Sequence, residues 1–335
     1  MSARSAGSVK KRSGGSEMAR ALFETSGDVL TDRRFEMARQ LHARGDAFAA
    51  ADLLQQVVER APGFAAAWFL LGQVRLAMDH GAGAIEAFRA ARREDPDDRH
   101  GAALWLARLD AAPIFGAMSP AYVRTLFDQY ASRFDTALVD NLAYRGPELM
   151  RDAIRHVCAQ RDRAPHFARV LDLGCGTGLA GAALRPLAGH LVGIELSERM
   201  IELARARGVY DDLEIGELRA FLERPHEAPY DLIVAVDVLV YIADLEPVIS
   251  AAARILDRSG LFAFTIESRA GGDHAADDQI GDVELTGHLR YAHGESHVRG
   301  AILRAGLSAV GFERVSTRME GGAAVPGFLV ITGHP

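Results

Sequence analysis

Several features that mark secreted, membrane-embedded or nucleic-acid-binding proteins are scarce or absent in this sequence. Only two of its 335 residues are cysteines, Cys158 and Cys175, so we expect neither a disulfide framework nor a metal site, and a reducing, cytoplasmic location fits best. No apolar run reaches the roughly 18 residues that cross a bilayer, which predicts no membrane partner. Acidic residues outnumber basic ones, and the net charge of −7 argues against a nucleic-acid partner.

The N-terminal segment also lacks the apolar stretch of a secretory signal. Its basic residues, among them Lys10 and Arg12, lie among serines and glycines. Since so few apolar residues cannot bury a core, we predict a disordered tail over 1–30. A targeting or nucleic-acid-binding arm is the alternative.

The next part of the chain repeats with a period of 34 residues. Pro96 follows Pro62 by this spacing, and Ala84 follows Ala50. The period is typical of tetratricopeptide repeats (TPRs), in which small residues let paired helices approach and large ones fill the space between them. The second copy carries the TPR pattern at Trp68, Leu71, Gly72, Ala84, Phe88, Ala91 and Pro96.

We therefore predict an all-α, TPR-like domain over 31–112. It consists of one repeat at about 31–64, a second at about 65–98 and a capping helix at about 99–110. Two prolines and a glycine predict a linker at 111–120. Because so short an array forms little concave groove, docking of a protein partner and a structural or dimerising role both stay open.

From about residue 168 onward, short apolar runs alternate with helical patterns, which predicts an α/β domain with a parallel sheet. The predicted strands are 169–173, 190–195, 212–215, 231–236, 261–267, 311–318 and 327–333. The predicted helices are 178–185, 197–206, 245–256 and 297–305.

The first predicted strand runs into three glycines at alternate positions, Gly174, Gly176 and Gly178. Glycine permits the tight turn and lets a ligand lie against the backbone. Asp172 ends the strand, where it can accept hydrogen bonds from a ligand's ammonium group. Glu195 ends the next strand, where a carboxylate can bind both hydroxyls of a ribose.

The D-x-G-x-G-x-G pattern at 172–178 resembles that of class I S-adenosylmethionine-dependent methyltransferases, whereas dinucleotide dehydrogenases usually show G-x-G-x-x-G. With the upstream repeats, the chain resembles the bacterial group of predicted TPR-containing methyltransferases. The resemblance implies a methyltransferase domain over 113–335 and S-adenosyl-L-methionine as cofactor. It also implies a Rossmann-like, seven-stranded sheet whose last strand, 327–333, runs antiparallel.

The resemblance also assigns residues to the cofactor, from its methionine part to its adenine. They are Asp172, Gly174, Cys175, Gly176, Gly178, Glu195, Leu196, Glu217 and Leu218. Glu217 stands where the family often has an aspartate that contacts the adenine amino group, and an exposed loop acid is the alternative.

Asp237 follows the strand at 231–236, at the edge of the sheet where ligands of parallel sheets bind. We predict that it contacts the cofactor or takes part in the reaction, while a structural loop role stays open. Tyr241 follows on the same loop. The sequence Asp-Val-Leu-Val at 237–240 lacks the [D/N]-P-P-[Y/F] motif of amino-methylating enzymes, which argues against base N-methylation.

The segment 289–299 concentrates polar and aromatic residues between the fifth and sixth strands. Class I enzymes often recognise the acceptor there. His293 is predicted to deprotonate the acceptor, because an imidazole titrates near neutral pH, and Tyr291 is predicted to contact it. The alternative is a loop that leads into a helix whose N-terminus Glu295 complements.

A row of aromatic residues, Phe127, Tyr130 and Phe134, recurs at helical spacing before the glycine loop. In many small-molecule methyltransferases a similar helix closes over the cofactor. The resemblance therefore implies lid helices over 121–165, with Tyr130 and Phe134 touching the cofactor. A helix packed on the core is the alternative.

These observations favour an enzyme that transfers the methyl group of S-adenosylmethionine to a small-molecule acceptor by direct displacement, without a metal. Two alternatives stay open. One is a protein methyltransferase whose TPR-like domain docks its substrate. The other is a cofactor-binding scaffold without turnover.

Overall fold

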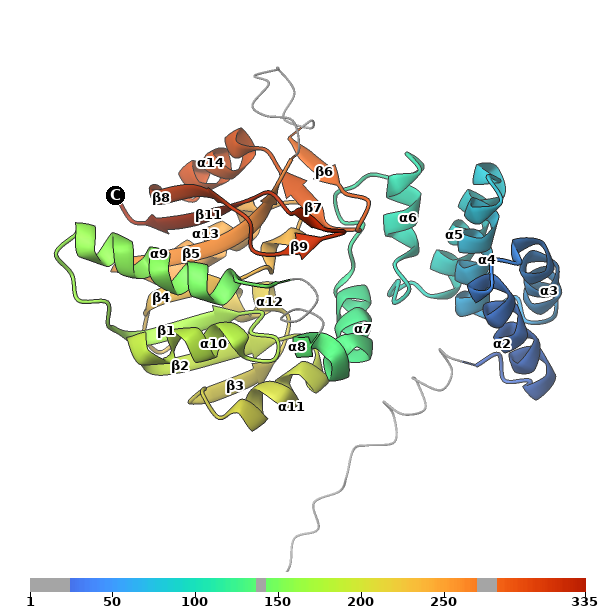
Figure 1. Ribbon diagram of the computed structural model, residues 1–335, viewed down its shortest axis with the longest axis horizontal. Helices are drawn as coiled ribbons and strands as arrows, with labels where there is room; N and C mark the ends of the chain where they lie inside the picture. Colours follow the sequence, from blue (N-terminus) through green and yellow to red (C-terminus); the bar gives the residue numbers. More distant parts are fainter. Residues whose placement is uncertain (1–24, 137–142, 270–281) are drawn as a thin grey trace, which may run out of the picture. The chain divides into compact units, whose positions relative to one another are not determined.

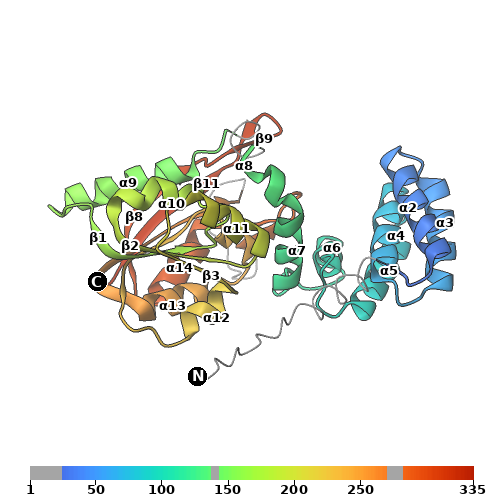
Figure 2. The ribbon, with the colours of Figure 1, turned by 90° about the horizontal axis from the view of Figure 1, so that it is seen from below.

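The structure is a computed structural model that describes residues 25–136, 143–269 and 282–335. The chain divides into two compact units, Met1–Ala112 and Pro113–Pro335, shown in Figures 1 and 2. The division falls between the same two residues as the predicted domain boundary. Most of the predicted tail, 1–24, lies outside the described residues.

The first unit is a row of antiparallel helices, as the 34-residue period predicts (Figure 1). Its helices are α2 (Val29–Ala43), α3 (Ala47–Arg60), α4 (Ala65–Ala77), α5 (Gly81–Glu94) and α6 (Ala102–Arg108). Asp46 caps the N-terminus of α3 by accepting a hydrogen bond from the backbone of Ala49. A Cβ atom on Gly72 would lie 2.5 Å from the ring of Phe88, so glycine is what lets α4 and α5 approach.

The second unit is a twisted, mostly parallel sheet, which confirms the predicted fold class. The seven main strands are β1 (Phe167–Leu173), β2 (Ala188–Glu195), β3 (Asp212–Ile215), β4 (Tyr230–Ala235), β5 (Leu256–Ser268), β8 (Ser308–Val315) and β11 (Gly327–Gly333). Their order is β3-β2-β1-β4-β5-β11-β8, and β11 runs antiparallel to both of its neighbours. All seven predicted strands and the antiparallel last strand are present.

Four short strands escape the sequence analysis. A hairpin of β6 (Val283–Leu285) and β7 (Tyr291–His293) extends the sheet beside the end of β5. A second hairpin joins β9 (Met319–Glu320) to β10 (Ala323–Ala324). Strands of two or three residues are too short to show an alternating pattern.

Helices cover both faces of the sheet (Figure 2). They are α9 (Gly146–Gln160), α10 (Leu179–Leu184), α11 (Glu198–Arg207), α12 (Leu218–Glu223), α13 (Glu246–Ile255) and α14 (Glu295–Arg304). The predicted lid segment 121–165 is wrong in its second half, because α9 buries Met150, Ile154 and Val157 in the core. Among the described residues, no helix combines the length and apolar character that crossing a membrane requires.

Candidate functional site

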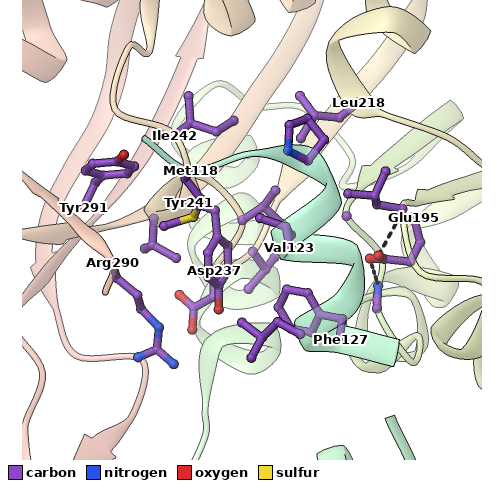
Figure 3. Close-up of a pocket in the computed structure, with 18 of the residues that line it drawn as sticks. Met118, Val123, Phe127, Glu195, Leu218, Asp237, Tyr241, Ile242, Arg290 and Tyr291 are labelled. Carbon is purple, nitrogen blue, oxygen red and sulfur yellow. Dashed lines mark hydrogen bonds between the residues drawn. The ribbon is translucent and has the colours of Figure 1, made fainter. Parts of the chain in front are cut away.

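A cavity of about 750 Å³ lies at the carboxyl ends of β1, β2 and β4, within the size range of small-molecule sites. Figure 3 shows Glu195 on one side of it and Arg290 with Tyr291 on the other. Val123 and Phe127 of helix α7 (Pro120–Tyr130) lie between these two ends. The cavity therefore joins the glycine loop to a second end built from later parts of the chain.

The backbone of the glycine loop has conformations that glycine adopts more readily than other residues do. Gly174, Gly176 and Gly178 have φ values of +64°, +54° and +89°, in the left-handed region that costs other residues free energy. A Cβ atom on Gly174 would also lie 2.6 Å from a methyl carbon of Val238. The loop thus presents bare backbone to the cavity, and the side chain of Cys175 is buried beside it.

Glu195 lines the cavity with a carboxylate that the backbone holds in place. Its Oε1 accepts hydrogen bonds from the N–H groups of Leu196 (2.7 Å) and Ser197 (2.8 Å), and its Oε2 accepts one from Gly176 (3.1 Å). The side chain is 8% exposed, and burial raises its pKa against the effect of these three donors. A buried, preoriented acceptor is suited to hydroxyl groups.

Asp172 lies outside the lining of the cavity, and its contact with a ligand stays a prediction. Its Oδ2 accepts a hydrogen bond from the hydroxyl of Tyr210 at 2.7 Å. Burial raises the pKa of Asp172 to about 7, although the Tyr210 hydroxyl opposes the rise. Along β1, Val170 packs on the face covered by α9 and α10, whereas Leu171 and Leu173 pack on the opposite face. The alternation of the strand therefore turns Asp172 toward α10.

Three residues predicted to contact an adenine, Leu196, Glu217 and Leu218, do line the cavity. The carboxylate of Glu217, however, caps helix α12. It accepts hydrogen bonds from the backbone N–H groups of Arg219 (3.0 Å) and Ala220 (2.7 Å). A capping carboxylate has less capacity left for a ligand.

Helix α7 lies along the cavity without burying any of its residues. The ring of Phe127 meets those of Phe134 and Tyr241 edge to face, with centroids 5.9 and 5.4 Å apart. Tyr130, which meets Phe134 in the same way, is 38% exposed. An apolar helix face that is only half-buried differs from a core stripe, and this favours the lid over the core helix among the two interpretations.

Two aspartates attach this aromatic segment to the cofactor side of the domain. Asp128 accepts a hydrogen bond from the Ser197 hydroxyl at 2.6 Å, at the N-terminus of α11. Asp135 accepts one from the hydroxyl of Thr177, in the glycine loop, at 2.5 Å, and pairs with Arg207 at 2.5 Å. These contacts join the aromatic segment to the glycine loop and to α11.

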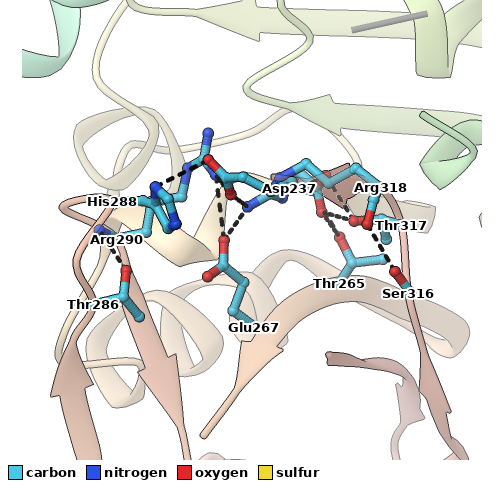
Figure 4. A network of polar contacts seen from close by, with 10 residues as sticks. Asp237, Thr265, Glu267, Thr286, His288, Arg290, Ser316, Thr317 and Arg318 are labelled. Carbon is cyan, nitrogen blue, oxygen red and sulfur yellow. Dashed lines mark hydrogen bonds and ion pairs between the residues drawn. The ribbon is translucent and has the colours of Figure 1, made fainter. Parts of the chain in front are cut away.

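A network of charged side chains forms the other end of the cavity (Figure 4). Arg318, which is 3% exposed, bonds to Glu267, and its Nη1 lies 3.4 Å from Oδ2 of Asp237. Nη1 of Arg290 lies 3.3 Å from Oε2 of Glu320 and 3.6 Å from Oε1 of Glu267. Three carboxylates thus face two guanidinium groups.

Asp237 belongs to this network and lines the cavity. Its backbone is in the left-handed region, with φ of +56°. Its carboxylate accepts hydrogen bonds from the hydroxyls of Thr265 (2.9 Å) and Thr317 (3.0 Å). The geometry gives it structural partners, and a direct contact with cofactor or acceptor stays a prediction.

His293 and Tyr291 are both buried, and the structure contradicts the predicted general base. His293 is 0% exposed, lies outside the lining of the cavity, and has its pKa lowered to about 3 by burial and by His297. A base must reach the proton that it removes. Tyr291 lines the cavity, but its hydroxyl donates to the carbonyl oxygen of Ile114 at 2.8 Å, and burial raises its pKa to about 12.

Comparisons with known proteins agree with this architecture. Residues 171–262 match a family model described as a methyltransferase domain, and residues 41–109 match a tetratricopeptide repeat model. The second unit therefore carries a methyltransferase domain. The methyltransferase domain predicted from the glycine loop is thereby confirmed, as is the TPR character of the first unit.

The curated relatives match only part of this chain, and the chain spans only part of their length. A ubiquinone biosynthesis O-methyltransferase from Xylella fastidiosa (strain 9a5c) is 29% identical over 147 residues, which are 37% of this chain and 60% of that protein. Human methyltransferase-like protein 27 is 34% identical over 114 residues, 34% of this chain and 45% of that protein. A solved methyltransferase from Clostridium acetobutylicum aligns with 63% of this chain and all of its own, with 19% identity and a TM-score of 0.45.

The residues at the first end of the cavity fit S-adenosylmethionine. The glycine loop is a cradle that side chains at Gly174 would obstruct, so it suits the flexible methionine part. The buried carboxylate of Glu195 suits the ribose hydroxyls. Leu196 and Leu218 supply apolar walls for a flat base.

Sequence reasoning missed most of the charged network. Arg290 lies within the segment 289–299 and His288 directly before it, but Arg318 and Glu320 belong to no motif. Their partners lie far away in the sequence, and Arg318 is 81 residues from Asp237. Only the folded chain brings these side chains together.

Proposed function

We propose that this methyltransferase transfers a methyl group from S-adenosylmethionine to a small-molecule acceptor that enters the second end of the cavity. The observation that carries the proposal is the continuity of the cavity. One continuous space runs from the glycine loop, beneath α7, to the apolar and charged residues around Tyr241 and Arg290. A small molecule fits such a space better than a folded protein surface does.

The protein's own contribution is binding, orientation and exclusion of water. Bound S-adenosylmethionine supplies an electrophilic methyl group. Glu195 and the glycine loop hold the cofactor, so that the acceptor meets it at a fixed distance, an effect worth up to roughly 7–11 kcal/mol of the activation barrier. Phe127 and Tyr130 of α7 line the space between the two and reduce the access of water to it.

The names of the relatives favour oxygen as the attacking atom. The Xylella protein is named an O-methyltransferase of ubiquinone biosynthesis. This chain covers only 60% of that protein, so the relative's acceptor is not transferred here. A hydroxyl acceptor is the part of the name that we propose for this protein.

Two measurements test the proposed function. Calorimetry is expected to show binding of S-adenosylmethionine and S-adenosylhomocysteine, with no binding of NAD. Incubation of a cell extract with methyl-labelled cofactor is expected to place the label in the small-molecule fraction. Label confined to protein would favour the alternative enzyme, and binding without any labelled product would favour the scaffold.

A docking role for the TPR unit is a second proposal, supported by one observation. Phe48 of α3 is 78% exposed, and Leu30 and Met37 of α2 are 58% and 57% exposed. Large exposed apolar side chains often mark protein contacts. The substitution Phe48→Ser is expected to leave cofactor binding unchanged and to reduce co-purification of a partner.

The cytoplasmic location inferred from the sequence stays a prediction.

A further inference from the structure

We propose that His288, oriented by Glu320, is the general base that takes the proton of a phenolic hydroxyl on the acceptor. This inference rests on the proposed methyl transfer and specifies the acceptor class and the catalytic residue. His288 takes the role of general base that the sequence analysis gave to His293, which lies five positions later and is buried in the core.

The fold delivers His288 to the cavity at the tip of a hairpin. The turn between β6 and β7 is closed by hydrogen bonds from Thr286 N–H to the carbonyl oxygen of Arg290 (2.8 Å) and from Leu289 N–H to that of Thr286 (3.0 Å). Leu289 adopts φ of +56°, which is uncommon for a residue other than glycine. All three tip residues, His288, Leu289 and Arg290, line the cavity.

Glu320 determines which ring nitrogen of His288 can accept a proton. Nδ1 of His288 lies 3.2 Å from Oε1 of Glu320. A carboxylate at Nδ1 favours the tautomer that carries its proton there, so Nε2 keeps the lone pair that accepts a proton. Glu320 acts through His288 and is therefore a positioning residue.

The charged network explains how Glu320 is held. Its Oε2 lies 3.3 Å from Nη1 of Arg290 and 3.9 Å from Nη2 of Arg318. Arg318 in turn is fixed by Asp237 and Glu267 (Figure 4). Buried ion pairs are often no more stabilising than apolar residues of the same size, so stability alone does not explain this network. We infer that the network serves to orient Glu320.

The charge balance of the network also suits a base. Three carboxylates, Asp237, Glu267 and Glu320, face two guanidinium groups, those of Arg290 and Arg318. The carboxylates of this network therefore exceed its guanidinium groups by one, and the carboxylate beside the His288 ring is that of Glu320.

The walls near His288 favour a phenolic acceptor. Imidazole can take the proton of phenolic and alkyl hydroxyls alike as the new bond forms, so the base alone does not select between them. A phenol also brings an aromatic ring, and Met118, Tyr241 and Tyr291 line this part of the cavity.

The proton and electron balance is complete without a further reactant. As the acceptor oxygen bonds to the methyl carbon, its proton passes to Nε2 of His288. The electron pair of the broken carbon–sulfur bond stays on sulfur, so the sulfonium becomes a neutral thioether. His288 then releases its proton to water, which it reaches because its side chain is 63% exposed.

The first test detects proton transfer without turnover. The probe is 4-nitrocatechol, whose phenolate absorbs visible light, added to the full-length protein with S-adenosylhomocysteine. The wild type is expected to generate the phenolate band at a lower pH than free solution does, and His288→Gln is expected to abolish this shift. A shift that persists in His288→Gln, or that is absent from the wild type, would overturn the proposal.

The second test compares two acceptors of different acidity in the methyl-transfer assay. With catechol, His288→Gln is expected to lower kcat by roughly 10²- to 10⁴-fold, the usual contribution of a general base. With 4-nitrocatechol, which is largely ionised at pH 8, the loss is expected to be small. Glu320→Gln is expected to lower kcat for catechol by a smaller factor and to leave KM for the cofactor unchanged. Equal losses for both acceptors would contradict the base assignment.

The matched control is another histidine–carboxylate pair outside the cavity. Nε2 of His190 lies 2.8 Å from Asp212 across strands β2 and β3, and neither residue lines the cavity. His190→Gln is expected to keep both the spectral shift and the catechol rate. The wild type could bind the cofactor and label small molecules of the extract, yet methylate neither catechol nor 4-nitrocatechol. In that case the phenolic inference fails while the proposed function stands.

Discussion

The buried pair of Asp172 and Tyr210 makes the stability of the domain depend on pH in a direction that can be worked out. Burial raises the pKa of Asp172 from 3.8 to about 7 in the folded protein. The folded state therefore holds this proton more tightly than the unfolded state does. The tighter binding of this proton stabilises the folded state fully below pH 4. The stabilisation is lost as the pH rises to about 7, and the free energy of unfolding falls by about 4 kcal/mol in total.

The substitution Tyr210→Phe removes the hydroxyl that donates to Asp172 at 2.7 Å. At pH 5 the carboxyl group is neutral, and the lost hydrogen bond costs about 0.5–1.5 kcal/mol. At pH 8 the carboxylate is charged, and the loss costs about 1.5–3 kcal/mol. We expect the difference in free energy of unfolding between variant and wild type to widen by about 1–2 kcal/mol between these pH values.

The measurement must report on the second unit alone, because both tryptophans, Trp68 and Trp105, lie in the helical unit. Amide hydrogen exchange of peptides within 167–195, followed by mass spectrometry at pH 5 and pH 8, meets this need. Tyr230→Phe is the control, since Tyr230 is 2% exposed and no carboxylate in the described part of the chain accepts its hydroxyl. A constant difference between Tyr210→Phe and wild type across this pH range would refute the reasoning.

Three further predictions concern the cofactor end. Glu195→Ala is expected to weaken S-adenosylmethionine binding by about 1.5–3 kcal/mol in calorimetry, because the ribose hydroxyls lose a charged acceptor; unchanged affinity would remove the ribose assignment. Gly174→Ala is expected to lower the thermal midpoint, since a left-handed residue costs about 1–3 kcal/mol and the new Cβ would meet Val238 at 2.6 Å; an unchanged midpoint would contradict the strain. Tyr130→Ala is expected to leave the midpoint of the cofactor-free protein nearly unchanged and to weaken cofactor binding, as a half-exposed lid residue should; the reverse pattern would identify a core helix.

The framework of the fold could be predicted because its signals are local. Short, largely apolar segments that alternate with helical patterns predict all seven main strands, and a 34-residue period predicts the helical repeats. The glycine loop is equally local, since a positive φ at Gly174, Gly176 and Gly178 is a requirement of consecutive backbone. Helix α12, with only six residues, was missed because it offers less than two turns of periodicity.

The side chains at strand ends were harder to place, because one step along a strand reverses the direction of a side chain. Asp172 has the right position in the motif, yet its carboxylate turns toward Tyr210 and α10. His293 lies in the predicted acceptor segment, yet it faces the core while His288, on the turn before it, lines the cavity. Sequence spacing gives the neighbourhood of such residues and leaves their direction to packing.

The two ends of the cavity also differ in how the chain builds them. Apart from the aromatic residues of the preceding helix, the cofactor end is assembled from β1, β2, β3 and the loops directly after them, which follow one another in the sequence. The acceptor end gathers Asp237 after β4, Glu267 at the end of β5, Arg290 before β7 and Arg318 beside β9, all at the carboxyl edge of the sheet or in hairpins next to it. A short motif is therefore enough to predict the cofactor site, whereas the residues of the acceptor site can be found only from tertiary contacts. Substitutions at Arg290 or Glu320 should therefore change the choice of acceptor while leaving cofactor affinity intact.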